Sequence, residues 1–262
     1  MANMTSSVSA SQVAGELASA TFEEIPALVE HYREDPRQQV IKACERALKR
    51  HAKELSERER VNDMYELMHE LGGDGVVVGV DEVGRGSVAG PLTVCAVCLP
   101  MEPRIWGIND SKKLTPARRE LLSVKIAEVA IAIGFCHIAP ADIDEMGMAR
   151  AIRAAVAGAV ADTGLEPDCV LMDGNPLGAV PNERDVVKGD AKIACIAAAS
   201  IMAKVTRDEM MVEYDAEYPE YHLAESKGYA SPEHIEAIRK HGLSPLHRVS
   251  FCGNFLQTER LF

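Results

Sequence analysis

Four acidic residues carry the clearest chemical signal in this chain of 262 residues. Asp81 and Glu82 follow one apolar run, Asp173 follows another, and Asp190 precedes a long stretch of helix-forming residues. Carboxylates that gather where apolar strands end repel one another and lose hydration, so they need a positive partner. Divalent cations are such a partner because hard cations prefer oxygen ligands. We therefore predict that these residues bind metal ions, and two ions could clamp the attacking and leaving oxygens of a phosphodiester.

Each of these acids also has a purely structural interpretation. Asp190 could only cap a helix, Asp173 before Gly174 could only open a turn, and Asp81 with Glu82 could be a solvated strand end. The combination favours chemistry, because Asp81 and Asp173 both directly follow predicted buried strands. Neighbouring residues in a strand point to opposite faces, so the strand is expected to end or twist at this pair.

A glycine-rich turn, Gly84-Arg85-Gly86, follows the first acidic pair directly. Glycines let backbone amides approach a sugar–phosphate chain closely, and Arg85 can add charged hydrogen bonds. The run also invites comparison with dinucleotide-binding loops, which need a helix immediately after the glycines. Pro91 and the β-branched residues after it favour a strand instead. A nucleotide-binding oxidoreductase is therefore the weaker alternative.

Composition limits the possible classes of protein. Apolar residues make up 47% of the chain, enough for a full core, and no apolar run is long enough to cross a membrane. The seven cysteines are odd in number and lie mostly in apolar stretches, which predicts buried reduced thiols. Because the N-terminus also lacks a secretory signal, we expect a cytoplasmic protein. The net charge of −12 argues against bulk electrostatic binding of nucleic acid and requires a local basic patch for it.

The chain is expected to fall into three parts: a disordered N-terminus at 1–20, a helical extension at 21–73, and a main domain at 74–262 that includes the C-terminal helices. The first part is rich in Ser, Ala and Thr and has little periodicity. In the extension, Asp35-Pro36 is predicted to start a long helix to about Leu71. Cations recur along this helix, either as a solvated face or as a phosphate-contacting arm. They are Lys42, Arg46, Lys49 and Lys53.

The main domain is expected to be α/β. Its early strands are joined by a short Gly/Pro turn, which favours antiparallel pairing, and helices then alternate with strands. This order predicts a mixed five-stranded sheet flanked by helices. Strands are predicted at 76–80, 92–99, 131–139, 169–172 and 186–187, and helices at 115–130, 141–162, 190–214 and from 231 onwards. Asp190 is the predicted N-cap of the third of these helices.

Further candidates for substrate binding lie outside the acidic cluster. Ser111 and Lys112 precede a second lysine, Lys188 and Lys192 flank Asp190, and Lys204 is a further basic candidate. Tyr229 could stack on a nucleotide or pack as a partly buried side chain. The histidines have no spacing typical of a metal site, and a structural role is predicted for His247-Arg248.

Together, these motifs resemble bacterial ribonuclease HII. They occur in the family's order and span about residues 76–252. The intact Gly84-Arg85-Gly86 pattern favours this family over ribonuclease HIII. The matching blocks are Gly79–Gly86, Ala89-Gly90-Pro91, Asp110–Leu114, Met172-Asp173-Gly174, Lys188-Gly189-Asp190, Ala198–Val205, Lys227-Gly228-Tyr229 and Ser244–Arg248.

The resemblance implies a ribonuclease H-like fold and a requirement for Mg2+ or Mn2+. It implies endonucleolytic cleavage of the RNA strand of RNA/DNA hybrids by a two-metal mechanism. It also implies incision on the 5′ side of single ribonucleotides embedded in duplex DNA, which begins their removal during DNA replication and repair. The expected products carry 3′-hydroxyl and 5′-phosphate ends.

The resemblance also implies roles for individual residues. Asp81, Glu82, Asp173 and Asp190 match the family's catalytic metal ligands. Gly84, Arg85 and Gly86 match the turn that senses the ribose 2′-hydroxyl, Tyr229 matches the tyrosine at the RNA–DNA junction, and Ser111 with Lys112 falls in a matching block. The C-terminal residues 257–262 loosely resemble a sliding-clamp-binding peptide, and a monomer is expected. A non-catalytic nucleic-acid-binding module with this fold is the remaining alternative.

Overall fold

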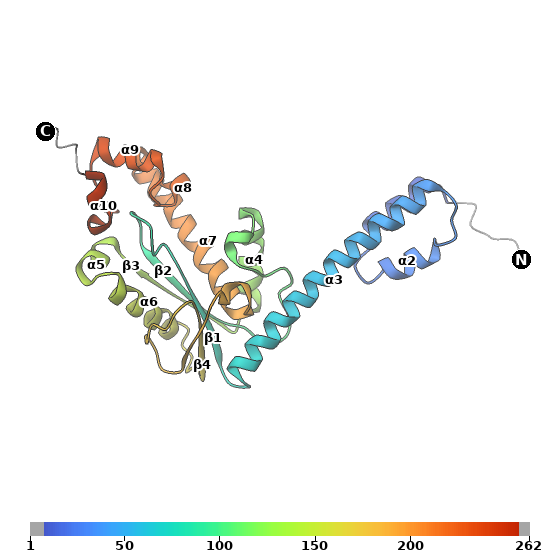
Figure 1. Cartoon of the computed structure of the whole chain (residues 1–262), viewed down its shortest axis with the longest axis horizontal. Helices are drawn as coiled ribbons and strands as arrows, with labels where there is room; N and C mark the ends of the chain where they lie inside the picture. The colour runs from blue at the N-terminus through green and yellow to red at the C-terminus, as the bar shows by residue number, and fades with distance from the viewer. Residues whose placement is uncertain (1–7, 257–262) are drawn as a thin grey trace, which may run out of the picture. The chain divides into compact units, whose positions relative to one another are not determined.

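The computed structural model describes residues 8–256, and these fall into two compact units that divide between Arg60 and Val61 (Figure 1). The smaller unit contains α1 (Ala10–Ser19), α2 (Ile25–His31) and the first part of α3 (Gln38–Gly72). The larger unit contains the end of α3, the sheet and the remaining helices.

The helix α1 corrects the prediction that residues 1–20 are disordered. Ser9 and Gln12 form a capping box, in which the Ser9 side chain accepts from the Gln12 N–H and the Gln12 side chain accepts from the Ser9 N–H. Val13 and Leu17, one helical turn apart, are buried in one cluster with Ile25. Their spacing gives the helix an apolar face that can pack. The pattern is hard to recognise in the sequence, because small and polar residues surround these two positions. Residues 1–7 lie outside the described part of the chain.

The long helix α3 confirms the helix predicted up to about Leu71, but its two ends belong to different units. Val61, Tyr65 and Met68 are buried in the main core of the larger unit. The Tyr65 hydroxyl also accepts the backbone N–H of Ile105 at 3.1 Å. The chain therefore divides into compact units earlier than the predicted boundary after residue 73, because the last turns of α3 are needed to cover the sheet.

The sheet is mixed and five-stranded, as predicted, with the order β3-β2-β1-β4-β5. The pairs β1–β2 and β2–β3 are antiparallel, whereas β1–β4 and β4–β5 are parallel. The edge strand β5 begins earlier than the two residues predicted, because its first positions are polar and carry no apolar signal. The strands are β1 (Val77–Val83), β2 (Leu92–Cys98), β3 (Ala132–Ile138), β4 (Cys169–Asp173) and β5 (Glu183–Val186).

Helices cover both faces of the sheet (Figure 1). One face packs against α5 (Pro140–Met146) and α6 (Met148–Asp162), and the other packs against α7 (Ala194–Glu217), which also contacts α4 (Pro116–Val129). The helix α7 lies directly on β1, since a Cβ atom at Gly79 would be 2.3 Å from the backbone carbon of Cys195. The small residues that begin α7 permit this approach.

Two helix predictions need correction. The helix predicted at 141–162 is broken into α5 and α6 at Gly147, whose φ of 79° is not helical. Asp190 does not cap α7: it lies in a short 3-10 turn, η2 (Gly189–Ala191), and Ile193 is the residue before α7. An aspartate at the start of a helical sequence is typical of an N-cap, but here the carboxylate lies near Lys112 instead.

The C-terminal part forms a separate apolar cluster beside the glycine-rich turn. Ser231 caps α9 by accepting the His234 N–H, as its sequence predicted.

Within residues 8–256, no helix is long and apolar enough to cross a membrane. The predicted clamp-binding peptide at 257–262 lies outside the described residues. The helical elements here are η3 (Pro219–Tyr221), α8 (Leu223–Ser226), α9 (Pro232–His241) and α10 (Val249–Leu256), and η1 (Ser111–Lys113) precedes α4.

Candidate metal-binding active site

Asp81 and Glu82 lie within β1 and not after it, because the strand continues to Val83. Asp81 pairs with Cys95 and Glu82 with Val94, residues that belong to the cores on opposite faces of the sheet. The alternation of a regular strand therefore sends the two acidic side chains to opposite faces. The prediction that the strand ends at this pair is wrong. Of these two acids, only Asp81 faces α7.

Asp81 is only 7% exposed, and a hydrogen bond from Ser200 on α7 holds it. The Ser200 hydroxyl lies 2.9 Å from the hydroxyl of Ser111, so the two serines connect η1 to this carboxyl group. Burial, with a smaller contribution from the nearby charges of Glu82 and Asp173, raises the pKa of Asp81 to about 8, although the Ser200 hydrogen bond opposes the rise. The protein thus concentrates negative charge here without an equal positive charge of its own.

Asp173 ends β4 on the same face as Asp81. The parallel register pairs Val80 with Met172, so the next residues along the two strands lie side by side. The Oδ1 atom of Asp173 accepts the backbone N–H of Gly189 at 2.7 Å. This bond ties the strand end to the turn that carries Asp190.

Asp190 completes the acidic group from the α7 side of the sheet. It is 5% exposed, and its Oδ2 atom lies 3.5 Å from Nζ of Lys112. Burial raises the pKa of Asp190, the charges of Asp173 and Asp110 add to that effect, and Lys112 opposes it. For Glu82 on the other face, burial likewise raises the pKa, while Arg85 at 3.4 Å lowers it.

The donor set fits a hard divalent cation in its chemistry. The candidate ligands are carboxylate oxygens, and burial and mutual repulsion raise the pKa values of Asp81, Glu82 and Asp190. However, across residues 8–256 no three acidic, histidine or cysteine side chains are already gathered as a metal-ligand cluster. The structure brings the predicted acids to one end of the sheet, but does not close them around one point.

The glycine-rich turn lies against two buried arginines: Arg207, which the sequence did not single out, and Arg248, for which a structural role was predicted. Gly84 has a φ of 82°, and a Cβ there would be 2.3 Å from Nε of Arg207. Arg207 comes from α7, and Arg248 precedes α10. Arg248 donates to the carbonyl oxygens of Gly90 at 2.9 Å and Arg85 at 3.2 Å.

Tyr229 lies on a loop that is hydrogen-bonded to this turn. The backbone N–H groups of Val88 and Ala89 both donate to the carbonyl oxygen of Gly228, at 2.8 and 3.0 Å. A Cβ atom at Gly228, where φ is 76°, would be 2.2 Å from the Ala89 oxygen. The Tyr229 side chain remains 40% exposed and so is available for stacking. The structure therefore brings the predicted turn and the predicted tyrosine together.

The predicted structural role of His247-Arg248 is confirmed. His247 and His234 are buried, and their Nε2 atoms lie 3.1 Å apart. His234 Nδ1 is 2.9 Å from the carbonyl oxygen of Tyr229, and His247 Nδ1 accepts the Ser244 N–H at 3.0 Å. Burial lowers the pKa of both rings, that of His247 to about 4, so the pair is neutral. This histidine pair stabilises the Tyr229 loop through the hydrogen bond between His234 and the Tyr229 carbonyl oxygen.

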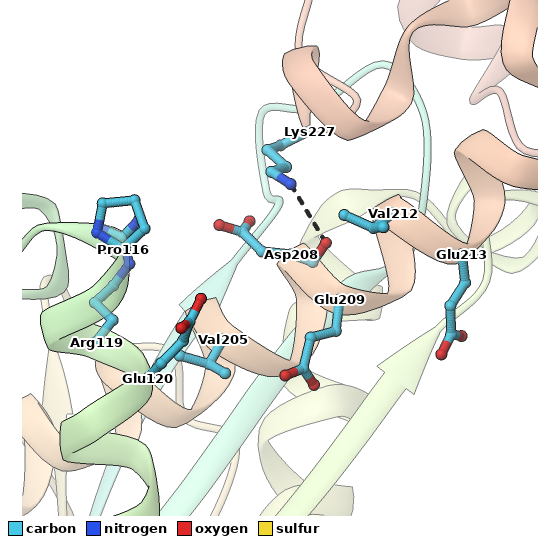
Figure 2. A pocket seen from close by; sticks show the side chains of 9 residues that line it. All are labelled: Pro116, Arg119, Glu120, Val205, Asp208, Glu209, Val212, Glu213 and Lys227. Carbon is cyan, nitrogen blue, oxygen red and sulfur yellow. Dashed lines mark hydrogen bonds between the residues drawn. The ribbon is translucent and has the colours of Figure 1, made fainter.

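Some basic candidates serve local structure. Lys192 donates to the Val187 carbonyl oxygen at 2.9 Å, and Lys204 forms an ion pair with Asp208 at 2.7 Å. Figure 2 shows a pocket of about 440 Å³ between α4 and α7, where Lys227 Nζ lies 3.5 Å from the backbone oxygen of Asp208. It is lined mostly by other acidic and apolar side chains and contains none of the four carboxylates, so it is separate from the candidate site.

The family follows from the comparison with known proteins. The family model for ribonuclease HII matches residues 78–254, and the model for the ribonuclease HII N-terminal domain matches residues 9–71. The chain belongs to the ribonuclease HII family. A ribonuclease HII from Geobacillus thermodenitrificans is 42% identical over 85% of this chain and 87% of its own length. Family membership supports ribonuclease H endonuclease activity, the hydrolysis of RNA paired with DNA.

Solved structures agree with this fold. The ribonuclease H2 from Pyrococcus horikoshii is 27% identical, with a TM-score of 0.59 over 70% of this chain and 99% of that one. The ribonuclease HII in a complex with PCNA from Archaeoglobus fulgidus is 25% identical, with a TM-score of 0.58 over 66% of this chain and 94% of that one. The ribonuclease H-like fold is therefore confirmed.

Proposed function

We propose that this protein is a metal-dependent endoribonuclease that cleaves the RNA strand of RNA/DNA hybrids. We also propose that it incises duplex DNA on the 5′ side of a single embedded ribonucleotide, leaving 5′-phosphate and 3′-hydroxyl ends. The observation that carries this proposal is the pair of aspartates, Asp81 and Asp173, side by side on parallel strands. Asp190 and the turn at Gly84 lie next to them, and the family of the chain supports the same activity.

Asp81, Glu82, Asp173 and Asp190 would hold Mg2+ or Mn2+. The bound ions supply the positive charge that activates a water molecule and stabilises the leaving 3′ oxygen. The protein's own groups prepare the ligands: Ser200 holds the Asp81 carboxyl group, and the Gly189 N–H holds Asp173. The raised pKa of Asp81 is the feature that a nearby cation would reverse.

Recognition of the substrate falls to the turn and its neighbours. In this proposal, the backbone and side chain at Gly84, Arg85 and Gly86 contact the ribose 2′-hydroxyl, the only group that separates the two sugars. The half-exposed Tyr229 stacks on the base at the RNA–DNA junction. Ser111 contacts Ser200 and Lys112 contacts Asp190, and these contacts support the proposal that η1 binds beside the scissile phosphate.

The direct test uses a labelled DNA duplex that carries one ribonucleotide. Full-length protein is incubated with Mg2+, with Mn2+ and with a chelator, and an all-DNA duplex serves as the control. We expect cleavage on the 5′ side of the ribonucleotide only when metal is present. Folded protein that binds the duplex but leaves it intact with every metal would point to a nucleic-acid-binding module instead.

Arg85→Ala tests the role of the turn. The Arg85 side chain is exposed, and among the described residues its ion pair is with Glu82, so its removal should leave the fold intact. We expect the ratio of cleavage rates for ribonucleotide and deoxyribonucleotide substrates to fall about 10-fold or more. Arg150→Ala, an exposed arginine on α6, is the matched control and should keep the full ratio. An unchanged ratio in Arg85→Ala would refute the sensing role.

A contact with a sliding clamp is the proposed partner interaction. The archaeal relative was solved as a complex with PCNA, and residues 257–262 of this chain loosely resemble a clamp-binding peptide. A protein that stops at Leu256 should retain cleavage and lose co-migration with the clamp in size-exclusion chromatography. Equal clamp binding by both proteins would exclude this peptide. The expected monomeric state and cytoplasmic location stay predictions.

A further inference from the structure

Arg207 is a fully buried arginine with an unusual set of partners. Its guanidinium donates to the carbonyl oxygens of Pro91 at 2.9 Å, Lys227 at 2.8 Å and Ala89 at 3.1 Å, and to the hydroxyl of Ser87 at 2.8 Å. All four acceptors are neutral. Within the described residues, Arg207 forms no ion pair with a carboxylate.

A buried cation without a charged partner is costly, so its position calls for a physical reason. Burial lowers the pKa of Arg207, which reflects that cost. The planar guanidinium offers five donors in a fixed fork, and here the fork matches acceptors on two segments far apart in sequence. Ser87, Ala89 and Pro91 lie in the segment that directly follows the glycine-rich turn, whereas Lys227 belongs to the Tyr229 loop.

Arg207 also packs beneath the Gly84-Arg85-Gly86 turn and contacts Tyr229. The missing side chain of Gly84 makes room for its Nε atom, and Ser87 passes the contact on by donating to the Gly84 carbonyl oxygen at 2.9 Å. The carbon at the centre of the guanidinium lies 5.8 Å from the centroid of the Tyr229 ring. The turn and the tyrosine are thus positioned from one buried group.

We propose that Arg207 is a positioning residue that couples recognition of the ribose to stacking at the junction. It holds the Gly84-Arg85-Gly86 turn and Tyr229 at a fixed separation, so that both reach the same nucleotide together. This inference rests on the proposed function of the turn and of Tyr229. Within residues 8–256, the guanidinium of Arg248 donates to the carbonyl oxygens of Gly90 and Arg85 and forms no hydrogen bond with the Tyr229 loop, so coupling is assigned to Arg207 alone.

The first test is Arg207→Lys, which keeps the charge and loses the fork. We expect the ratio of ribonucleotide to deoxyribonucleotide cleavage to fall about 10- to 100-fold, since small displacements of positioning groups cost this much. KM for the single-ribonucleotide duplex should rise more than KM for a uniform RNA/DNA hybrid. In the hybrid every position carries a ribose, so the enzyme can bind productively at many positions along the strand. Arg50→Lys is the matched control, because Arg50 also donates to three carbonyl oxygens but lies in the smaller unit.

A second readout does not depend on activity. The amide protons of Val88 and Ala89 bond to Gly228 across the two segments. Hydrogen exchange should accelerate at these two amides in Arg207→Lys and remain unchanged in Arg50→Lys, while the sheet amides stay protected in both. A purely structural role would instead loosen α7 and the sheet together.

Ser87→Ala is the milder variant if Arg207→Lys does not fold. It removes one acceptor of Arg207 and the bond to Gly84, and leaves the other three acceptors in place. We expect substrate discrimination to fall and exchange at Val88 and Ala89 to accelerate, both by less than in Arg207→Lys. Folded Arg207→Lys or Ser87→Ala with normal substrate discrimination and normal exchange at Val88 and Ala89 would overturn the proposal. Lack of cleavage by the unmodified protein would instead overturn the proposed function, and the exchange readout would still test the coupling.

Discussion

The buried acids at this site store electrostatic repulsion that the fold must tolerate. Asp81 and Asp190 are both less than a tenth exposed, and each lies in the field of Asp173. A site selected for stability alone would replace such groups with neutral ones. The repulsion therefore predicts that removal of one charge strengthens the fold and harms the chemistry.

Asp81→Asn tests this trade-off. The pKa of Asp81 is about 8 in the folded protein and near 3.8 when unfolded. In the metal-free protein, stability is therefore lost as the pH rises from about 4 through about 8, because only the unfolded chain can ionise this group easily. At pH 8 in chelator, Asp81→Asn should raise the free energy of unfolding by about 2–4 kcal/mol. The gain should nearly vanish at pH 4.

Urea unfolding at the two pH values measures this effect, and Glu128→Gln on the exposed face of α4 is the control. Asp81→Asn should also abolish cleavage with Mg2+ or Mn2+. Equal stability of mutant and unmodified protein at both pH values would show that Asp81 is not strained by its surroundings.

Asp190→Asn separates chemistry from helix capping. Because Asp190 does not cap α7 and its pKa is raised by burial and by Asp173, the substitution should not lower the melting temperature. We expect kcat to fall about 100-fold or more, as carboxylates that hold catalytic cations contribute on this scale. Lys112→Gln removes the ion-pair partner and should cost much less. If both variants lost activity equally, the role of Asp190 would be limited to its contact with Lys112.

The site residues show where a sequence is informative and where it is not. The four carboxylates and the glycines were selected because their chemical types are costly or unusual next to apolar strands. Arg207 was missed because arginine is rarely fully buried, although this residue lies seven positions after Ser200 and therefore on the same face of α7.

The elements themselves were predicted with few errors, and the errors have local causes. Apolar runs located all five strands, but β1 continues through Asp81 and Glu82 because its ladder with β2 continues to Val83 and Thr93. Pairing across the sheet overrode the polar character of the strand end. Similarly, Gly147 splits a helix whose apolar pattern continues on both sides of the break.

The loop that carries Tyr229 depends on a pair of neutral histidines, so its stability should depend on pH. The pKa of His247 is lowered to about 4 and that of His234 is lowered as well, whereas the unfolded rings titrate near 6.5. Their contribution is thus complete above pH 6.5 and is lost as the pH falls towards 4, because the unfolded state then binds more protons. Between pH 7.5 and pH 4.5 the protein should lose about 2 kcal/mol through this pair.

His247→Gln keeps a group that can accept the Ser244 N–H and donate to His234. Its unfolding free energy should therefore depend less on pH over this interval than that of the unmodified protein. Urea titrations at several pH values measure the difference. His31→Gln, an exposed residue of the smaller unit, should leave the slope unchanged, and an identical slope for His247→Gln would contradict the assignment.

At the scale of the whole chain, the division inside α3 predicts which truncations fold. Removal of residues 1–60 leaves Val61, Tyr65 and Met68 in the core of the larger unit. Removal of residues 1–73 takes them away and exposes apolar surface on the sheet side. We expect the shorter deletion to keep the melting temperature of the larger unit within a few degrees, and the longer one to lower it by about 10 °C or more.

Differential scanning calorimetry of the two truncated proteins measures this difference. A sequence-based boundary at residue 73 would have predicted the opposite preference, since it treats the whole helix as an appendage. If both proteins melted at the same temperature, the last turns of α3 would not stabilise the sheet.

The distribution of the cysteines gives this protein a built-in set of probes. All seven are free, and each apolar cluster includes or contacts at least one. The partly buried Cys44 packs against the cluster of the smaller unit, Cys195 and Cys98 lie on opposite faces of the sheet, and Cys252 contacts Val88. Burial raises the pKa of each of these thiols, so they react slowly until their region opens. Pulsed alkylation followed by peptide mass spectrometry can therefore time the opening of each region in the natural sequence, without an introduced label.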